Sequence, residues 1–324
     1  MIRQLSVPLL FVGLVPACAA AQTAVQRTFV STTGDDTNTA SSCSPALPCR
    51  SFAAAMTVTK PGGEIVPLTS GGYGSVTITQ SVQIAAPFGV YAAITAASGN
   101  AITVNAAATD TVVLKGLAIN GLGTGNRGIS ATSFKALYVE NCVVSGFAGI
   151  GVIADYSTGA SPGSVSIKDT IVRNNADTGL YFRATYASTQ MPISIDTTRS
   201  EGNGQHGLLV TNSAKATISR TVTSFNGNSG FYVLNDTFLF KAEINCDGCV
   251  ASNNGNAGFA VFATTPGTVT TMRVARSSAT DNVSGFSQTL SLSGNSTFES
   301  LSGTNLVRGN TTNTIGTITP VTSP

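Results

Sequence analysis

The sequence predicts an all-β protein, a right-handed parallel β-helix whose short strands wind into stacked rungs. Two markers repeat along the chain in one register, with a usual step of 28 residues. The composition agrees, because 10% of the residues are charged, Gly numbers 34 and Trp is absent. Abundant Thr, Ser, Asn and Val are typical of strands separated by many turns.

The first marker is a pair of apolar residues two positions apart. Its members are Val112/Leu114, Leu137/Val139, Val165/Ile167, Ile193/Ile195, Ala216/Ile218, Ile244/Cys246 and Met272/Val274. The successive steps are 25, 28, 28, 23, 28 and 28 residues. Because side chains alternate between the two faces of a strand, each pair predicts two residues that point into the core.

The second marker is an asparagine ten residues after the start of the apolar pair. It recurs at Asn175, Asn203, Asn226, Asn254, Asn282 and Asn310. A glycine and a large apolar residue follow four of them, as Gly179-Leu180, Gly207-Leu208, Gly230-Phe231 and Gly258-Phe259. Stacked rungs place like residues on like, about 4.8 Å apart. We therefore expect a hydrogen-bonded asparagine ladder at one corner.

Residues 1–21 are predicted to be a signal peptide. Arg3 precedes an apolar run from Leu5 to Val15, and small residues follow to Ala21. A lipoprotein modified at Cys18 is the alternative. The apolar run is too short to span a bilayer, and no other transmembrane segment is expected. We therefore expect a secreted protein, periplasmic or extracellular.

The mature chain is predicted to form a single parallel β-helix domain over residues 22–310, with residues 22–63 as its N-terminal cap region. A short helix over Ser51 to Met56 would place its apolar face on the end of the core and stop at Pro61-Gly62-Gly63. Early rungs are expected at residues 64–66, 76–78 and 82–84. Residues 311–324 read as a polar C-terminal tail beyond the fold.

Cysteine usage fits an oxidising compartment. Cys43 and Cys49 bracket a short loop that a disulfide would close. The pairing of Cys142, Cys246 and Cys249 stays open. Cys246-Asp247-Gly248-Cys249 has CxxC spacing, and its place in the repeat favours a buried thiol or a local disulfide over redox or zinc chemistry.

Several N-terminal motifs resemble a known family. They are Phe29-Val30-Ser31, Gly34-Asp35-Asp36, Pro48-Cys49-Arg50-Ser51-Phe52, Pro61-Gly62-Gly63-Glu64-Ile65 and Gly71-Gly72-Tyr73-Gly74. Together with the rungs, they resemble secreted bacterial β-helix proteins of the pectate-lyase-like superfamily. The resemblance implies the fold but not one activity, because that superfamily includes lyases, hydrolases, epimerases, tailspikes and adhesins.

A lyase of this superfamily would use a basic residue and Ca²⁺ held by several carboxylates. The best candidate residues fall within about three rungs: Lys168, Asp169, Asp196, Arg199 and Arg220. Their alternating signs favour cross-strand ion pairs. Acidic residues are too scarce for a calcium cage, so we expect no metal and no cofactor, with Ca²⁺ only if the protein is a lyase.

Gln205-His206-Gly207 resembles a motif of the polygalacturonases in the same superfamily. The corresponding positions of other rungs hold Thr178, Ser229 and Ala257. No paired Asp residues accompany His206 within the rungs, as glycosidase chemistry requires. The repeat therefore predicts His206 to be a structural residue at an exposed corner.

Outward positions after the asparagine corner form an apolar ribbon in the predicted register. They are Tyr181, Leu209, Tyr232 and Ala260, with Arg183 two residues after the first. Such a ribbon indicates a binding surface. The alternative is that the loops at residues 184–192, 235–240 and 264–271 cover it.

These observations favour a secreted β-helix that binds an extended partner, expected to be a polysaccharide or a cell-surface glycan, along Tyr181, Arg183, Leu209 and Tyr232. A polysaccharide lyase or epimerase using Lys168, Asp196, Arg199 and Arg220 is one alternative. An adhesin or surface-structural protein is another. The net charge of +2 comes without a basic run, so no nucleic acid partner is expected. The oligomeric state stays open.

Overall fold

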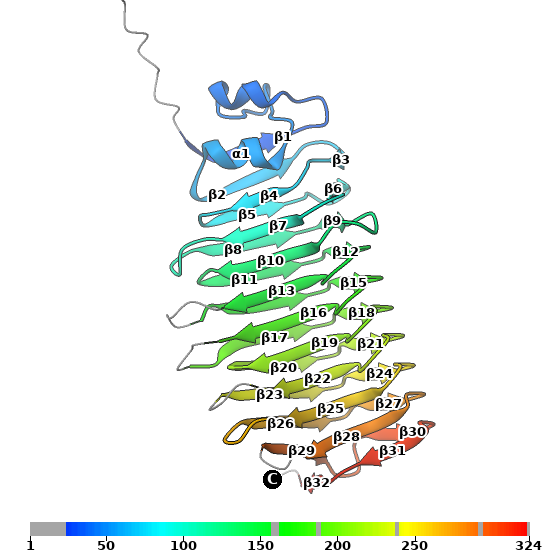
Figure 1. The fold of residues 1–324 in the computed structure, drawn as a ribbon. Helices are drawn as coiled ribbons and strands as arrows, with labels where there is room; N and C mark the ends of the chain where they lie inside the picture. The colour runs from blue at the N-terminus through cyan, green and yellow to red at the C-terminus, as the bar shows by residue number, and fades with distance from the viewer. Residues whose placement is uncertain (1–23, 157–161, 186–188, 237–239, 291–293, 323–324) are drawn as a thin grey trace, which may run out of the picture.

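Three parallel sheets, wound around one long axis, build the protein (Figure 1). The computed structural model describes residues 24–156, 162–185, 189–236, 240–290 and 294–322, so the predicted signal peptide lies outside the described residues. Within these ranges the sheets hold 12, 10 and 10 strands, and their order follows the chain from rung to rung. The right-handed parallel β-helix predicted from the repeat is confirmed.

Sheet A carries the apolar pairs of the first marker. Its strands are β1 (Val25–Val30), β2 (Thr59–Pro67), β5 (Val82–Ala85), β8 (Thr111–Lys115), β11 (Ala136–Glu140), β14 (Ser164–Lys168), β17 (Met191–Asp196), β20 (Ala214–Ser219), β23 (Lys241–Asp247), β26 (Val269–Ala275), β29 (Asn295–Leu301) and β32 (Ile318–Val321). Every pair predicted from β8 to β26 lies in register with the next. All of these side chains are buried.

Sheet B consists of shorter strands. They are β3 (Gly71–Gly72), β6 (Ala92–Thr95), β9 (Leu117–Asn120), β12 (Val143–Ser145), β15 (Ile171–Arg173), β18 (Arg199–Glu201), β21 (Val222–Ser224), β24 (Val250–Ser252), β27 (Ser278–Thr280) and β30 (Leu306–Arg308).

Sheet C follows the asparagine corner. Its strands are β4 (Val76–Ile78), β7 (Asn100–Asn105), β10 (Arg127–Ser133), β13 (Val152–Tyr156), β16 (Leu180–Ala184), β19 (Leu208–Asn212), β22 (Phe231–Asn235), β25 (Ala257–Ala263), β28 (Ser284–Leu290) and β31 (Thr312–Ile315). The large apolar residues after the glycines, such as Leu208 and Phe231, are register neighbours with buried side chains.

The predicted asparagine ladder is present between sheets B and C. The side-chain amide of Asn203 donates to Oδ1 of Asn226 over 3.0 Å, and Asn226 donates in the same way to Asn254. The same oxygen of Asn226 also accepts the backbone N–H of Asn203, over 3.1 Å. Because these side chains are buried, the ladder satisfies polar groups that would otherwise be costly. It therefore fixes the register of successive rungs.

The glycine that recurs four residues after each ladder asparagine has a steric cause. A Cβ atom on Gly207 would lie 2.8 Å from Nδ2 of Asn226, and one on Gly230 would lie 2.9 Å from Nδ2 of Asn254. Each glycine therefore leaves room for the ladder of the next rung.

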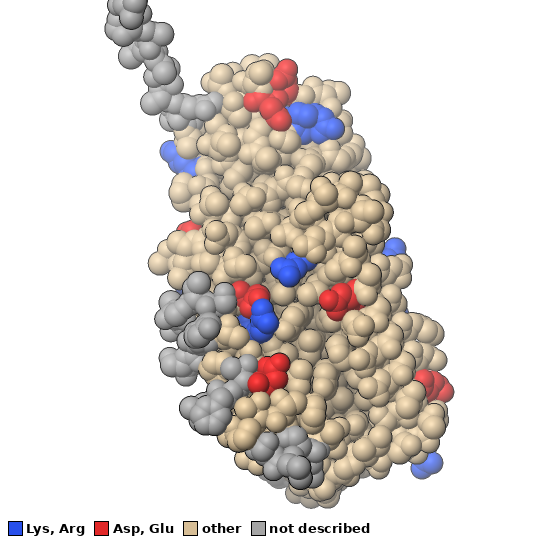
Figure 2. Space-filling model, viewed as in Figure 1, with Lys and Arg blue, Asp and Glu red and all other residues tan. Residues whose placement is uncertain are grey.

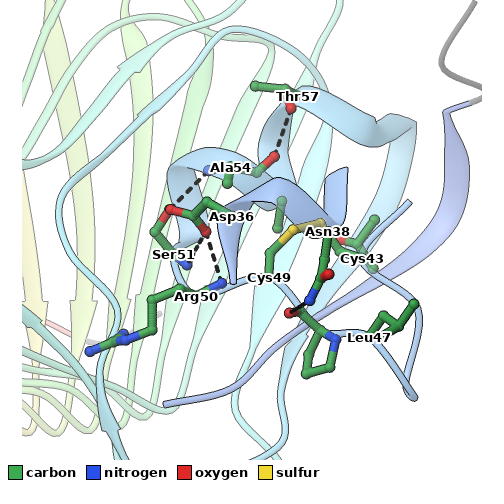
Figure 3. The surroundings of a disulfide bond; sticks show 12 residues. Asp36, Asn38, Cys43, Leu47, Cys49, Arg50, Ser51, Ala54 and Thr57 are labelled. Atoms are coloured by element: carbon green, nitrogen blue, oxygen red, sulfur yellow. Dashed lines mark hydrogen bonds between the residues drawn. A yellow bond between two sulfur atoms is a disulfide. The ribbon is translucent and has the colours of Figure 1, made fainter. Parts of the chain in front are cut away.

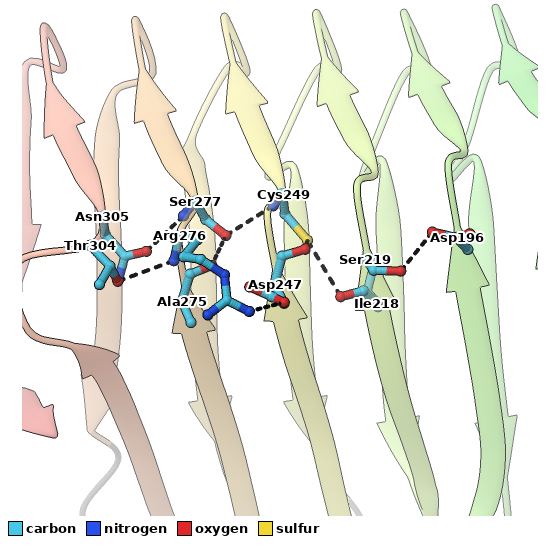
Figure 4. A network of polar contacts seen from close by, with 10 residues as sticks. All are labelled: Asp196, Ile218, Ser219, Asp247, Cys249, Ala275, Arg276, Ser277, Thr304 and Asn305. Atoms are coloured by element: carbon cyan, nitrogen blue, oxygen red, sulfur yellow. Dashed lines mark hydrogen bonds and ion pairs between the residues drawn. The ribbon is translucent and has the colours of Figure 1, made fainter. Parts of the chain in front are cut away.

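A second ladder of small polar residues lies at the corner between sheets A and B (Figure 4). The hydroxyl of Ser277 donates to the Ala275 carbonyl over 2.7 Å and accepts the Cys249 N–H over 3.0 Å. Cys249 occupies this corner and forms a disulfide with Cys246, which has an S–S distance of 2.09 Å. Of the two readings of the CxxC segment, the local disulfide is the one observed.

Cys142 occupies the same corner column as a buried thiol. Its N–H faces the Thr170 hydroxyl over 3.4 Å. Burial raises the pKa of this thiol to about 12. The thiol is therefore protonated and unreactive in the folded protein.

The N-terminal end of the core is covered by α1 (Phe52–Val58) and the adjacent η1 (Asp36–Ser41), a 3₁₀ helix. Phe52 and Ala55 are fully buried, as predicted for the capping face. The helix ends at Val58, before the predicted stop at Pro61, because Thr59 already has an extended backbone and begins β2. Within the described ranges no helix is long and apolar enough to cross a membrane.

Side-chain bonds tie this cap together (Figure 3). The Asp36 carboxylate accepts the Arg50 and Ser51 N–H groups, over 2.8 and 2.9 Å, and the Ser51 hydroxyl over 2.8 Å. A disulfide joins Cys43 and Cys49, whose Cα atoms are 5.0 Å apart.

The C-terminal boundary needs correction. Residues 311–324 were expected to be a tail, but β31 extends sheet C and β32 extends sheet A. Most of their side chains are exposed. Backbone pairing with the preceding rung holds them, and this pairing needs no apolar residues.

Candidate functional site

A row of outward side chains crosses sheet C. Ile153, Tyr181, Leu209, Tyr232 and Ala260 are successive register neighbours on β13, β16, β19, β22 and β25. Tyr181, Leu209 and Tyr232 are half-buried, although they face away from the core. The alternative was that three loops cover this row; two of them include residues 186–188 and 237–239, which lie outside the described residues.

Two hollows lie along this row. The first has a volume of about 510 Å³ and is lined by Asp177, Thr178, Tyr181, His206 and Leu209, among others. The second has a volume of about 240 Å³, and its lining includes His206, Asn228, Tyr232, Asn256 and Ala260. Because His206 lines both, we treat them as one surface, the sheet C groove.

The sheet C groove runs along the long axis of the molecule. Its lining extends from Ile150, which precedes β13, to Ser287 on β28. Neighbouring strands are about 4.8 Å apart, so five strand-to-strand steps cover about 24 Å. An extended polymer therefore matches the groove better than a compact small molecule.

His206 forms part of the groove wall. Its ring packs on the ring of Tyr232, with centroids 4.7 Å apart and an interplanar angle of 30°. Burial lowers the pKa of His206 to about 4, and nearby Asp177 opposes this shift only partly. His206 is therefore neutral at pH 7. Its Nδ1 atom is buried and has no hydrogen-bond partner among the described residues.

This placement corrects the prediction that His206 lies at an exposed corner. The repeat correctly aligns His206 with Thr178 and Ser229, but it carries no information on the Tyr232 ring that folds against it. The signal was the pairing of a lone histidine with an outward tyrosine on the following rung. Sequence reasoning did not connect the two residues.

Arg183 lies beside the groove and forms an ion pair with Asp155. Its Nε donates to Oδ1 of Asp155 over 2.9 Å, and Nη2 donates to the other carboxylate oxygen. The guanidinium also lies over the Tyr181 ring, 5.8 Å from the centroid. The hydrogen bonds from Arg183 to Asp155 raise the pKa of Arg183 and hold its side chain against Tyr181.

The charged candidates Asp196 and Arg220 lie together at the corner of sheets A and B. Nη2 of Arg220 is 2.5 Å from Oδ1 of Asp196. The Ser219 hydroxyl donates to the same oxygen over 2.7 Å, as Figure 4 shows. The Ser219 hydrogen bond and, less strongly, Arg220 lower the pKa of Asp196. Lys168 is exposed and is the register neighbour of Asp196.

Arg199 belongs to a different contact. It lies on β18 in sheet B and forms an ion pair with Glu201 of the same strand. Further ion pairs lie at the ends of sheet A strands, as the pair of Asp196 and Arg220 does. They join Lys115 with Glu140, at 3.2 Å, and Arg276 with Asp247. These four ion pairs are separate from one another and partly exposed, so each is worth about 0–1 kcal/mol.

Sheet A has hollows of its own, and one of them, with a volume of about 430 Å³, lies near the C-terminal end. Arg273, Glu299, Asp247 and Arg276 line it. Arg273 forms ion pairs with Glu299 and Glu243, both at 2.6 Å. The charged side chains at this hollow therefore pair with one another.

The residues do not fit a calcium site. Within the described residues no three His, Cys, Asp or Glu side chains gather as metal ligands. The Asp196 carboxylate instead pairs with Arg220, and its register neighbour on β14 is the cationic Lys168.

No protein-family model and no curated protein sequence matches the chain. The solved structure of pectate lyase Pel9A is similar, with a TM-score of 0.58, 15% sequence identity and coverage of 87% of this chain and 80% of that chain. The A-module of the mannuronan C-5 epimerase AlgE6 from Azotobacter vinelandii has a TM-score of 0.50 and 13% identity, covering 81% of this chain and 91% of that chain.

At these identities the similarity concerns the fold. Together with the three parallel sheets, it shows that the chain has the right-handed parallel β-helix fold of pectate-lyase-like proteins.

Proposed function

We propose that the protein binds an extended polysaccharide along the sheet C groove, without chemical turnover. The observation that carries the proposal is that Tyr181, His206 and Tyr232, from successive rungs, line two hollows that share His206. Aromatic side chains offer apolar faces together with polar edges, which suits the faces and hydroxyls of sugar rings. The groove repeats at the strand spacing, so it offers similar contacts to successive units of a polymer.

The structural neighbours support the choice of partner. Pectate lyase and mannuronan epimerase are named for polysaccharide substrates, and both have the same fold. The two disulfides and the predicted signal peptide of residues 1–21 support a site of action outside the cytoplasm.

The proposal assigns no catalytic step to Lys168, Asp196, Arg199 or Arg220. Asp196 is held by Ser219 and Arg220, while Arg199 is engaged with Glu201 on another sheet. The four residues therefore do not converge as an acid, a base and a substrate clamp would.

Affinity electrophoresis through gels containing one glycan each tests the proposal. The panel includes neutral polymers, such as glucans, mannan and xylan, and acidic polymers, such as polygalacturonate and alginate. We expect at least one glycan to retard the protein, and the double variant Tyr181→Ala/Tyr232→Ala to lose roughly tenfold or more in affinity.

The matched control is Tyr138→Ala on β11. Tyr138 is exposed on sheet A, away from the groove. Its removal should leave retention unchanged, and circular dichroism should show that all variants fold. Absence of retention on every glycan, or equal loss in the Tyr138 variant, contradicts the proposal.

A further inference from the structure

We propose that the sheet C groove selects an uncharged glycan over a polyuronate. This inference rests on the proposed function and names the chemical class of its ligand. It also separates this protein from its structural neighbours, whose names refer to pectate and mannuronan.

The charge of the groove lining is the first argument. Among the described residues, Asp177 is the charged side chain of the first hollow, and the second hollow is lined by neutral side chains. Neither lining includes Lys or Arg. A polyuronate brings a carboxylate with each sugar and would meet Asp177 without a compensating cation.

Arg183, which lies over the Tyr181 ring, does not supply this cation. Both carboxylate oxygens of Asp155 accept hydrogen bonds from Arg183, so the guanidinium is already neutralised. His206 cannot replace it at pH 7, because burial holds its ring in the neutral form. Recruiting Arg183 to a uronate would leave Asp155 unpaired, which offsets the gain.

The polar groups that do line the groove suit hydroxyls. Asn228 and Asn256 stand on adjacent rungs, and the amide of Asn256 donates to Oδ1 of Asn228 over 3.1 Å. Amide groups offer both donors and acceptors, and therefore match the two-way hydrogen bonding of sugar hydroxyls. A carboxylate can only accept hydrogen bonds, so it could pair with the amide N–H groups but not with the amide oxygens.

The face of the molecule drawn in Figure 2 is consistent with this preference. Figure 2 shows charged side chains scattered singly or in small groups on the face it presents, without a large patch of either sign among the described residues. Long-range attraction of an anionic polymer would need such a positive patch.

The ligand class is tested by charge reversal at Asp177. The Asp177 carboxylate accepts the Thr178 N–H over 2.7 Å, an interaction that Asp177→Asn can keep. Affinity electrophoresis compares the wild-type protein, Asp177→Asn and Asp177→Lys on one neutral glycan that binds and on polygalacturonate, at low and moderate salt.

We expect the wild-type protein to bind the neutral glycan at least tenfold more tightly than polygalacturonate. Asp177→Lys should gain about tenfold affinity for polygalacturonate, and salt should reduce that gain. Asp177→Asn removes the negative charge without adding a positive one, so it should raise the affinity for polygalacturonate by a smaller factor than Asp177→Lys.

The outcomes separate the two proposals. Tyr232-dependent binding of polygalacturonate by the wild-type protein, equal to or tighter than that of neutral glycans, overturns the ligand class and leaves the groove function standing. Failure of all glycans to bind overturns the groove function itself.

Discussion

The imidazole ring of His206 packs on the phenol ring of Tyr232, and His206 lines both of the hollows that make up the sheet C groove. The two residues come from adjacent rungs. His206 immediately precedes β19, and Tyr232 lies on β22. The repeat predicts His206 to be a structural residue, but its contact with Tyr232 makes it part of the candidate site.

The first prediction concerns acid stability. The folded-state pKa of His206 is about 4, below its ordinary value of 6.5, so protons bind the unfolded state more readily. The free energy of unfolding should therefore fall by about 1–3 kcal/mol from this residue as the pH drops from 6.5 to 4.

Urea unfolding at pH 7 and at pH 4 checks this prediction. Carboxylates also titrate in this range, so the informative quantity is the difference between the wild-type protein and His206→Gln. The variant should lose less stability on acidification. Identical losses in the two proteins would show that His206 is not buried in the neutral form.

The second prediction concerns the asparagine ladder. In Asn226→Ala, Asn203 loses the oxygen that accepts its side-chain amide and its backbone N–H. Because both groups are buried, we expect the free energy of unfolding to fall by about 2–4 kcal/mol. The exposed Asn256 provides the control, since Asn256→Ala should change stability by about 0.5 kcal/mol or less. Equal effects of the two substitutions in denaturant melts would contradict a structural role for the ladder.

The third prediction concerns cysteine reactivity. Cys43–Cys49 and Cys246–Cys249 are disulfides, and Cys142 is a buried thiol whose pKa is raised to about 12. In a Cys18→Ser background, a thiol reagent should label no site in the native protein and one site after denaturation without reductant. Rapid native labelling, or three labelled sites after denaturation, would refute the assigned pairing.

The fourth prediction concerns the ion pair at the sheet A corner. Arg220→Ala removes a partner of Asp196, but both side chains are partly exposed and Ser219 continues to donate to Asp196. We expect a stability change of about 1 kcal/mol or less and unchanged glycan retention. Loss of retention in this variant would move the binding site from sheet C to sheet A.

Much of the fold was predictable from sequence because a solenoid repeats its constraints. Each rung must place an apolar pair inward and an amide at the same corner. The spacing of Val165, Ile167 and Asn175 therefore predicts the register of the neighbouring rungs. The C-terminal strands escaped prediction for the opposite reason. Residues 312–315 are Thr-rich and exposed, and their pairing depends on the backbone of β28 rather than on side chains.

The candidate site was predictable only in part. The alternation of strands placed Tyr181, Leu209 and Tyr232 on one outward row. It could not place His206 against Tyr232, since that contact depends on how two side chains lean across a corner. Likewise, sequence spacing grouped Arg199 with Asp196, although the turn between β17 and β18 sends them to different sheets.

A fluorescence titration tests the central claim most directly. The chain contains no Trp, so Leu209→Trp places a single tryptophan in the groove, and Tyr138→Trp places one on sheet A as a control. A neutral glycan that retards the protein should saturably shift or quench the emission of the tryptophan at position 209 and leave the emission at position 138 unchanged. A response at position 138 alone, or at neither position while the glycan still binds, would contradict binding in the sheet C groove.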